Sequence, residues 1–127
     1  MGVTKLTSFG KELRKFRVDK NIVLTDMANM LGFTAAYISA IENGKRAIPV
    51  KFIDKIENHY FLSKESLKKL KIACIETQES INISFPDNFK ENHCFIETAY
   101  LLSEKFPLLN EAQIEKIRDV LLEVGDN

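Results

Sequence analysis

The chain has 127 residues, of which 45% are hydrophobic and 28% are charged, and its 18 basic residues balance its 18 acidic ones. Such a composition is typical of a folded globular protein and argues against an intrinsically disordered chain, which would have fewer apolar residues. No stretch approaches the roughly 20 apolar residues of a membrane-spanning helix and the first twenty residues carry charges throughout, so we expect a cytoplasmic protein with no membrane contact.

Apolar residues at helical spacing predict a first helix over about residues 8–19. They recur at i, i+4 and i+7, at Phe9, Leu13 and Phe16. Thr7 or Ser8 can provide the N-cap. A second apolar run ends at Gly32, and Thr34 is a good N-cap for a helix over residues 34–43 that Gly44 terminates.

Two more helices are predicted before residue 79. Pro49 suits the first turn of a fourth helix, whose inner face would consist of Phe52, Ile53, Ile56 and Tyr60. Ser63 can cap a fifth helix, which Leu67, Leu70 and Cys74 would line on one side.

Two short helices separated by a glycine turn, the second followed by a Gly-Lys-Arg loop, are typical of a helix-turn-helix. Over residues 9–62 the chain resembles the lambda-repressor-like (Xre/Cro) DNA-binding domain. The matching segments are Phe9-Gly10-Lys11-Glu12-Leu13-Arg14, Met27-Ala28-Asn29-Met30-Leu31-Gly32 and Tyr37-Ile38-Ser39-Ala40-Ile41-Glu42-Asn43-Gly44-Lys45-Arg46. Together with the helical periodicity of the whole chain, the resemblance predicts an all-α fold with a five-helix DNA-binding domain over residues 1–79. A short extended segment and a two-helix dimerisation or interaction region over residues 80–127 should follow it.

The resemblance also implies a set of DNA-contacting residues, which are Thr34, Ala35, Ala36, Tyr37, Ser39, Ala40, Asn43, Lys45 and Arg46. The alanines cannot form hydrogen bonds with bases, so they can only pack against thymine methyl groups. Lys45 and Arg46 would contact phosphates. For Tyr37 an alternative is packing in the core of the domain.

Three further positions have a physical role in the motif. We expect Ala28 to be small because two helices cross there, and Gly32 to adopt a positive φ, which only glycine does without cost. Val23 stands where relatives have a capping Ser or Thr. The helix therefore either starts late, at Thr25, or leaves its first amides to water or phosphate.

Beneath the motif, the resemblance implies an ion pair between Arg17 and Glu42, the alternative being two exposed and unpaired charges. Charge is also distributed unevenly along the chain. Residues 1–63 carry ten basic and six acidic residues, a net charge of +4, and the remainder carries −4. A polyanionic partner should therefore meet the first half.

Enzymatic and metal-binding functions have little support in the sequence. His93 and Cys94 are adjacent on a helix, so their side chains diverge by about 100°. Together with His59 and Cys74 they do not match the spacing of zinc ligands. We expect both cysteines to be reduced, no cofactor and no metal.

The pattern changes after Glu79. Ile81, Ile83 and Phe85 alternate with polar residues, which fits either a short strand or a linker. Helical spacing resumes at residues Phe95, Ala99, Leu102 and Phe106. A last helix should start at a capping box of Asn110 and Gln113, and we expect its apolar stripe to form a dimer interface through Ile114, Ile117, Leu121 and Val124.

The sequence thus predicts a non-enzymatic, sequence-specific transcriptional regulator, a homodimeric repressor that binds double-stranded DNA in the major groove. The alternative is an antitoxin whose carboxy-terminal region binds a toxin and which regulates its own operon. The strand at residues 81–85, if present, could pair with its symmetry mate.

Overall fold

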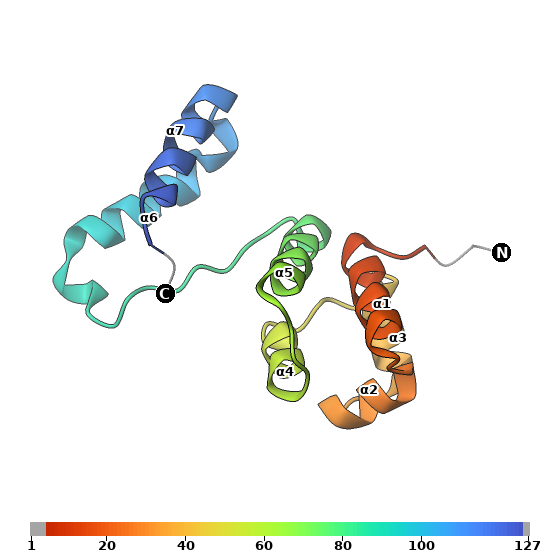
Figure 1. The fold of residues 1–127 in the computed structure, drawn as a ribbon. Helices are drawn as coiled ribbons and strands as arrows, with labels where there is room; N and C mark the ends of the chain where they lie inside the picture. Colours follow the sequence, from red (N-terminus) through yellow and green to blue (C-terminus); the bar gives the residue numbers. More distant parts are fainter. Residues whose placement is uncertain (1–4, 126–127) are drawn as a thin grey trace. The chain divides into compact units, whose positions relative to one another are not determined.

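The computed structural model describes residues 5–125, and every regular element in this range is helical (Figure 1). The α-helices are α1 (Ser8–Lys20), α2 (Leu24–Leu31), α3 (Ala35–Glu42), α4 (Phe52–His59), α5 (Lys64–Gln78), α6 (His93–Lys105) and α7 (Glu111–Leu122). Single turns of 3-10 helix, η1 (Phe89–Glu91) and η2 (Phe106–Leu108), flank α6. The all-α prediction is confirmed. By its contacts the chain divides into two compact units, Met1–Asn82 and Ile83–Asn127.

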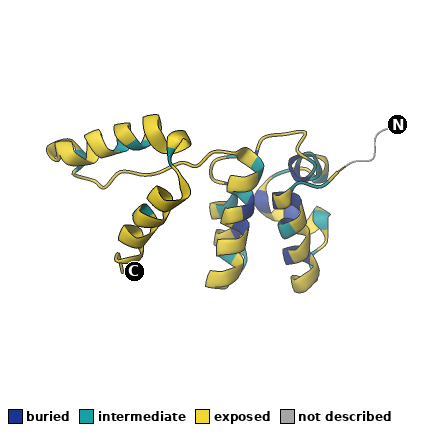
Figure 2. Cartoon of the chain, turned by 90° about the horizontal axis from the view of Figure 1, so that it is seen from above, coloured by how far each residue is buried: buried dark blue, intermediate teal, exposed yellow. Residues whose placement is uncertain are grey.

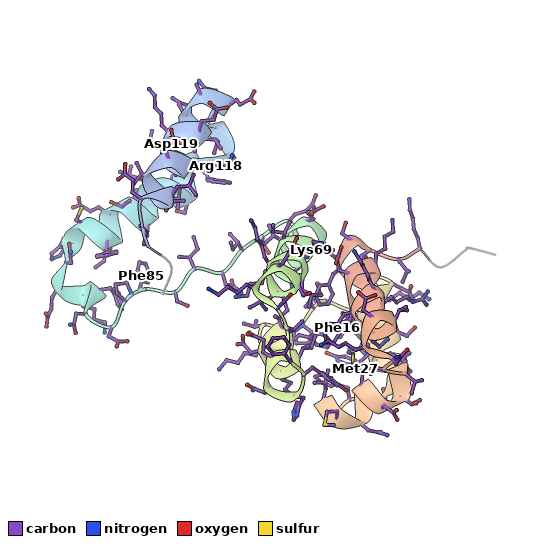
Figure 3. All side chains as sticks on the ribbon, viewed as in Figure 1. Phe16, Met27, Lys69, Phe85, Arg118 and Asp119 are labelled. Carbon is purple, nitrogen blue, oxygen red and sulfur yellow. The ribbon has the colours of Figure 1, made fainter. Side chains whose placement is uncertain are left out.

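The first unit encloses a core made by all five of its helices. Phe9 of α1 meets Phe52 of α4 edge to face at 5.8 Å between ring centroids, and Phe33 stacks on the same Phe52 ring at 5.8 Å. Figure 3 shows the side chains of Phe16 and Met27 directed into this core, where both are buried. Each such large apolar side chain contributes about 1.5–3 kcal/mol when fully buried. The core is what holds the short helices α2 and α3 in place.

Side-chain caps lie at the N-termini of most of the α-helices. Thr7 accepts a hydrogen bond from the amide of Gly10, and Ser63 accepts one from that of Ser66. The first helix is therefore confirmed at its predicted start, and Ser63 is confirmed as the cap of α5. Asn21 ends α1 in the left-handed region, at φ 55°, a conformation that asparagine tolerates better than most residues.

One prediction about a helix start is wrong. Pro49 does not lie in the first turn of α4, because the helix begins at Phe52; the Pro49 carbonyl instead accepts a hydrogen bond from the Phe52 amide in the turn that precedes the helix. For α2 the sequence left open a late start at Thr25 or first amides without a cap, and the structure has the second. The helix begins at Leu24, and Val23 occupies the N-cap without a side-chain hydrogen bond.

The helix α5 closes the first unit against α1. Leu70 and Ala73 are buried there, whereas Leu67 and Cys74 of the predicted face are only partly buried. The Thr77 hydroxyl accepts a hydrogen bond from the Phe9 amide at 3.0 Å. A side chain in the last turn of α5 thus provides the acceptor for a backbone amide in the first turn of α1. The Gln78 side chain likewise donates to the carbonyl of Ile48 at 3.0 Å.

The second unit has helices and no buried core. None of its described residues, 83–125, is buried, and Figure 2 shows its helices coloured almost wholly as exposed. The capping box predicted for α7 is confirmed, with Asn110 and Gln113 each accepting the other's backbone amide. Local caps therefore define these helices, while their apolar side chains remain in contact with solvent. Within this single chain, residues 81–85 form no strand.

Candidate nucleic-acid interface

The turn between α2 and α3 has the geometry that the sequence predicts. Gly32 adopts φ 77°, in the left-handed region, and its amide and that of Phe33 bond back to α2 carbonyls. Ala28 is only 2% exposed where α2 packs in the core. Thr34 then caps α3 by accepting a hydrogen bond from the Tyr37 amide at 3.0 Å. The two helices are thus fixed by a glycine turn and a capping hydroxyl.

The helix α3 is divided into a buried and an accessible side. Ile38, Ile41 and Glu42 are buried. The predicted DNA-contacting residues lie on the accessible side of the helix or just beyond its ends; they are either exposed (Thr34, Ala36, Lys45, Arg46) or partly exposed (Ala35, Tyr37, Ser39, Ala40, Asn43). We call these nine residues the α3 surface.

Because its alanines carry only methyl groups, the α3 surface has few projecting side chains and few hydrogen-bonding groups. Thr34 and Ser39 supply hydroxyls, and the Asn43 amide donates to the Ser39 hydroxyl at 3.4 Å. That bond uses one of the two side-chain donors of Asn43, so its other donor and its carbonyl oxygen remain for a ligand. The chemistry available to DNA is therefore a methyl surface with a polar pair near the end of the helix.

The loop after α3 holds two cations in fixed positions. Gly44 adopts φ 77°, and the amides of Lys45 and Arg46 both donate to the carbonyl of Ala40, at 2.8 and 3.2 Å. The Arg46 guanidinium lies 5.7 Å from the centroid of the Tyr37 ring. Tyr37 itself is partly buried and packs against the core, which is the alternative that the sequence left open for it.

A buried ion pair supports α3 from behind. The two terminal guanidinium nitrogens of Arg17, Nη1 and Nη2, donate one hydrogen bond each to the carboxylate oxygens Oε2 and Oε1 of Glu42, and the two residues are 7% and 1% exposed. The bidentate arrangement fits the planar fork of arginine. Arg14 approaches the same carboxylate at 3.9 Å from a largely exposed position. The carboxylate is thus neutralised in the core, where an unpaired charge would be costly.

The main chain of Glu42 is held as firmly as its side chain. Its carbonyl accepts hydrogen bonds from both the amide and the hydroxyl of Thr7, each at 3.0 Å. Gly10 lies against this same carbonyl. Sequence reasoning noted Gly10 as part of a matching segment but missed its contact, and it missed Thr7 as a second anchor of α3.

The start of α2 has free amides close to the motif. Because Val23 cannot cap, the first amides of this helix have no side-chain partner. Leu24 is partly buried against the core. A phosphate could bind these amides, as anions do at helix N-termini.

Among the described residues there is no metal-binding cluster, no membrane-spanning helix and no disulfide. Within residues 5–125, histidine, cysteine and acidic residues nowhere gather in a group of three that could hold a metal ion. No helix over the same residues is both long and apolar enough to cross a membrane. Cys74 is partly buried, Cys94 is exposed, and neither forms a disulfide.

Comparison with known proteins matches the part of the chain that carries this geometry. Residues 13–67 match the family described as "Helix-turn-helix". A curated relative, the HTH-type transcriptional repressor RghR of Bacillus subtilis, is 43% identical over 44 residues, which are 35% of this chain and 33% of that protein. The chain thus matches about one third of the relative's length. No solved structure matches the chain.

Proposed function

We propose, from the premise that residues 13–67 form a domain of the helix-turn-helix family, that this chain is a sequence-specific DNA-binding regulator of transcription that acts as a dimeric repressor. The observation that carries the proposal is the α3 surface. It is accessible along one side of a helix whose other side is fixed by the Arg17–Glu42 pair, and two cations follow at its end. The match to a repressor supports a regulator and not an enzyme.

The geometry supports a simple division of roles. The helix α3 enters the major groove, where Ala36 and Ala40 pack against thymine methyl groups and Ser39 with Asn43 supplies hydrogen bonds to base edges. Lys45 and Arg46 contact phosphates and so determine the position of the helix on the duplex. A repressor bound in this way blocks polymerase by occupying its operator.

Selection of bound fragments from fragmented chromosomal DNA tests the proposal. The full chain should enrich a limited set of fragments that share a short sequence. The variant with Lys45→Ala and Arg46→Ala should bind all sequences more weakly, with a shallower dependence of affinity on salt, because fewer counterions are released. A wild-type chain that enriches no sequence, or a double variant with unchanged affinity and salt slope, contradicts the proposal.

The tail supports the dimeric part of the proposal. A single helix-turn-helix covers one half-site, and two copies related by a two-fold axis place their helices about 34 Å apart, one turn of DNA. On α7, Ile114 and Leu121 are 36% and 64% exposed, and Val124, which lies just beyond the end of the helix at Leu122 and not on it as the sequence predicts, is 70% exposed. An apolar stripe of this kind gains stability when a second copy covers it.

The same exposed tail also favours a second candidate, an antitoxin that binds a toxin through its carboxy-terminal helices. The two functions differ in what covers the tail. Purified alone, the repressor is a dimer, whereas the antitoxin gains ordered structure in residues 83–125 only with its toxin. Light scattering of the purified chain reports whether it is a dimer, and hydrogen exchange in residues 83–125 with and without the toxin reports whether they gain order.

A further inference from the structure

A row of aromatic rings joins the helix-turn-helix to α4. Phe33, in the turn between α2 and α3, packs on Tyr37 of α3 at 5.0 Å between centroids and stacks on Phe52 of α4 at 5.8 Å with an interplanar angle of 12°. Phe52 is fully buried, so the row is anchored in the core. Any group that rests on these rings is therefore held in a fixed position relative to α3.

Two cations rest on this row. Arg46 lies over the Tyr37 ring, and the Lys55 ammonium of α4 lies 4.6 Å from the centroid of the Phe33 ring. A lysine over an aromatic face is attracted by the ring's negative quadrupole, which contributes about 0.5–1 kcal/mol at an exposed site. The ring occupies one side of the ammonium and leaves its other side free to donate hydrogen bonds.

The charge of Lys55 has no acidic partner in the part of the chain that the structure describes. The residue is exposed, and none of the ion pairs formed within residues 5–125 includes it. Lys69, in contrast, pairs with Glu65 on the same helix at 3.8 Å. Lys55 is thus a positioned and uncompensated cation, which is what a phosphate requires of its partner.

We propose that Lys55 is a further phosphate-contacting residue and that the Phe33 ring positions its ammonium beside α3. This inference rests on the proposed function, because it takes α3 as the helix that enters the major groove. That groove is about 12 Å wide, so cations beside a helix lying in it meet the phosphates of the groove wall. Lys55 and Arg46 lie over the neighbouring rings of Phe33 and Tyr37, and Lys55 belongs to α4, an element outside the helix-turn-helix.

The test measures affinity of the full chain for a selected duplex and an unrelated duplex over a range of salt concentrations. Lys55→Ala should weaken binding to both duplexes about equally and reduce the slope of log affinity against log salt by about 0.9, the value for one phosphate contact. Lys68→Ala, which removes an equal charge from an exposed position on α5, is the matched control and should leave the slope unchanged.

The positioning role of Phe33 requires a separate comparison. Phe33→Leu should weaken binding in the wild-type chain but have no further effect in the Lys55→Ala chain, while Phe33→Tyr, which keeps a ring, should preserve both affinity and salt slope. Thermal melts of each variant report whether the domain remains folded. A folded Phe33→Tyr variant whose salt slope falls as far as that of Lys55→Ala, or a folded Phe33→Leu variant with unchanged affinity, contradicts the positioning role.

The result that overturns the inference is a salt slope for Lys55→Ala equal to that of Lys68→Ala while the Lys45→Ala, Arg46→Ala variant shows a reduced slope. In that case DNA binding and the role of the loop stand, and only the contact by Lys55 is wrong. A wild-type chain that binds neither duplex at low salt instead overturns the proposed function itself.

Discussion

Gly10 and Glu42 touch through their backbones. A Cβ atom added to Gly10 would overlap the carbonyl group of Glu42, the residue that ends α3. Because the neighbour is backbone and not the end of a flexible side chain, it cannot move aside without displacing the helix. The close approach of α1 to the end of α3 therefore depends on a missing side chain.

Replacement of Gly10 by alanine should destabilise the first unit. In an open helix this change stabilises by about 0.5–1 kcal/mol, but here the overlap should reverse the sign and lower the free energy of unfolding by about 1–3 kcal/mol. Denaturant melts measure the effect. Gly125→Ala, where an added Cβ meets no atom within 4 Å, is the control, and an equal result for both variants would contradict the contact.

The Arg17–Glu42 pair should show strong coupling in a double-mutant cycle. Arg17→Ala leaves a buried carboxylate without its main partner, at a cost of about 3–5 kcal/mol, and the double variant with Glu42→Ala should recover part of that loss. The exposed pair of Lys69 and Glu65 supplies a reference, with an expected coupling of about 0.3–0.5 kcal/mol. A coupling energy near zero for the buried pair would show that the Arg17–Glu42 interaction does not stabilise the domain.

Glutamine in place of the alanines of α3 should change the preferred DNA sequence. Ala36 is exposed and Ala40 partly so, and glutamine at either position adds an amide that can bond adenine in the major groove. Selection of DNA fragments by Ala36→Gln and Ala40→Gln should return a sequence different from that of the wild type. An unchanged sequence for both variants would place these residues away from the bases.

A charge on the apolar stripe of α7 should weaken dimerisation. Leu121→Glu puts a carboxylate into the proposed interface, so the monomer should appear in light scattering at concentrations where the wild type is a dimer. Glu115→Lys, a charge change off the stripe, should leave the dimer intact. A wild-type chain that is monomeric at micromolar concentration, or one truncated after Glu79 that stays dimeric, would exclude the tail from this role.

The two thiols should differ in reactivity. Burial raises the pKa of the Cys74 thiol above its ordinary value, so less of it is thiolate at pH 8, and its partly buried position limits access. A disulfide reagent should therefore modify the exposed Cys94 first, and the rate for Cys74 should keep rising at higher pH. Cys94→Ser and Cys74→Ser assign the two phases; equal rates for both thiols would show that Cys74 is not shielded.

Much of the first unit could be predicted because its signals are local. Hydroxyl caps at Thr7, Thr34 and Ser63, and the glycine turn at Gly32, depend on residues within a few positions of each other. The start of α4 was misplaced because the preference of proline for a first turn is only a local signal. The helix begins three residues later, at Phe52, which is buried in the core.

The contacts that could not be predicted join residues far apart in the chain. The hydrogen bond between Phe9 and Thr77 and the cation over an aromatic ring at Lys55 and Phe33 depend on how the helices pack, which spacing alone does not report. The proposed dimer interface on α7 is of the same kind. The apolar stripe can be read from the sequence, but the surface that would cover it belongs to a second copy of the chain, so no contact within one chain includes it.

The hydrogen bond from the Phe9 amide to the Thr77 hydroxyl has a practical consequence for protein engineering. It brings the beginning and the end of the first unit side by side, so a portable DNA-binding cassette should run from Thr7 to Gln78, well beyond residues 13–67. The same adjacency makes the unit suited to circular permutation, with a short linker joining its ends and new termini opened beside the exposed Phe61, between α4 and α5.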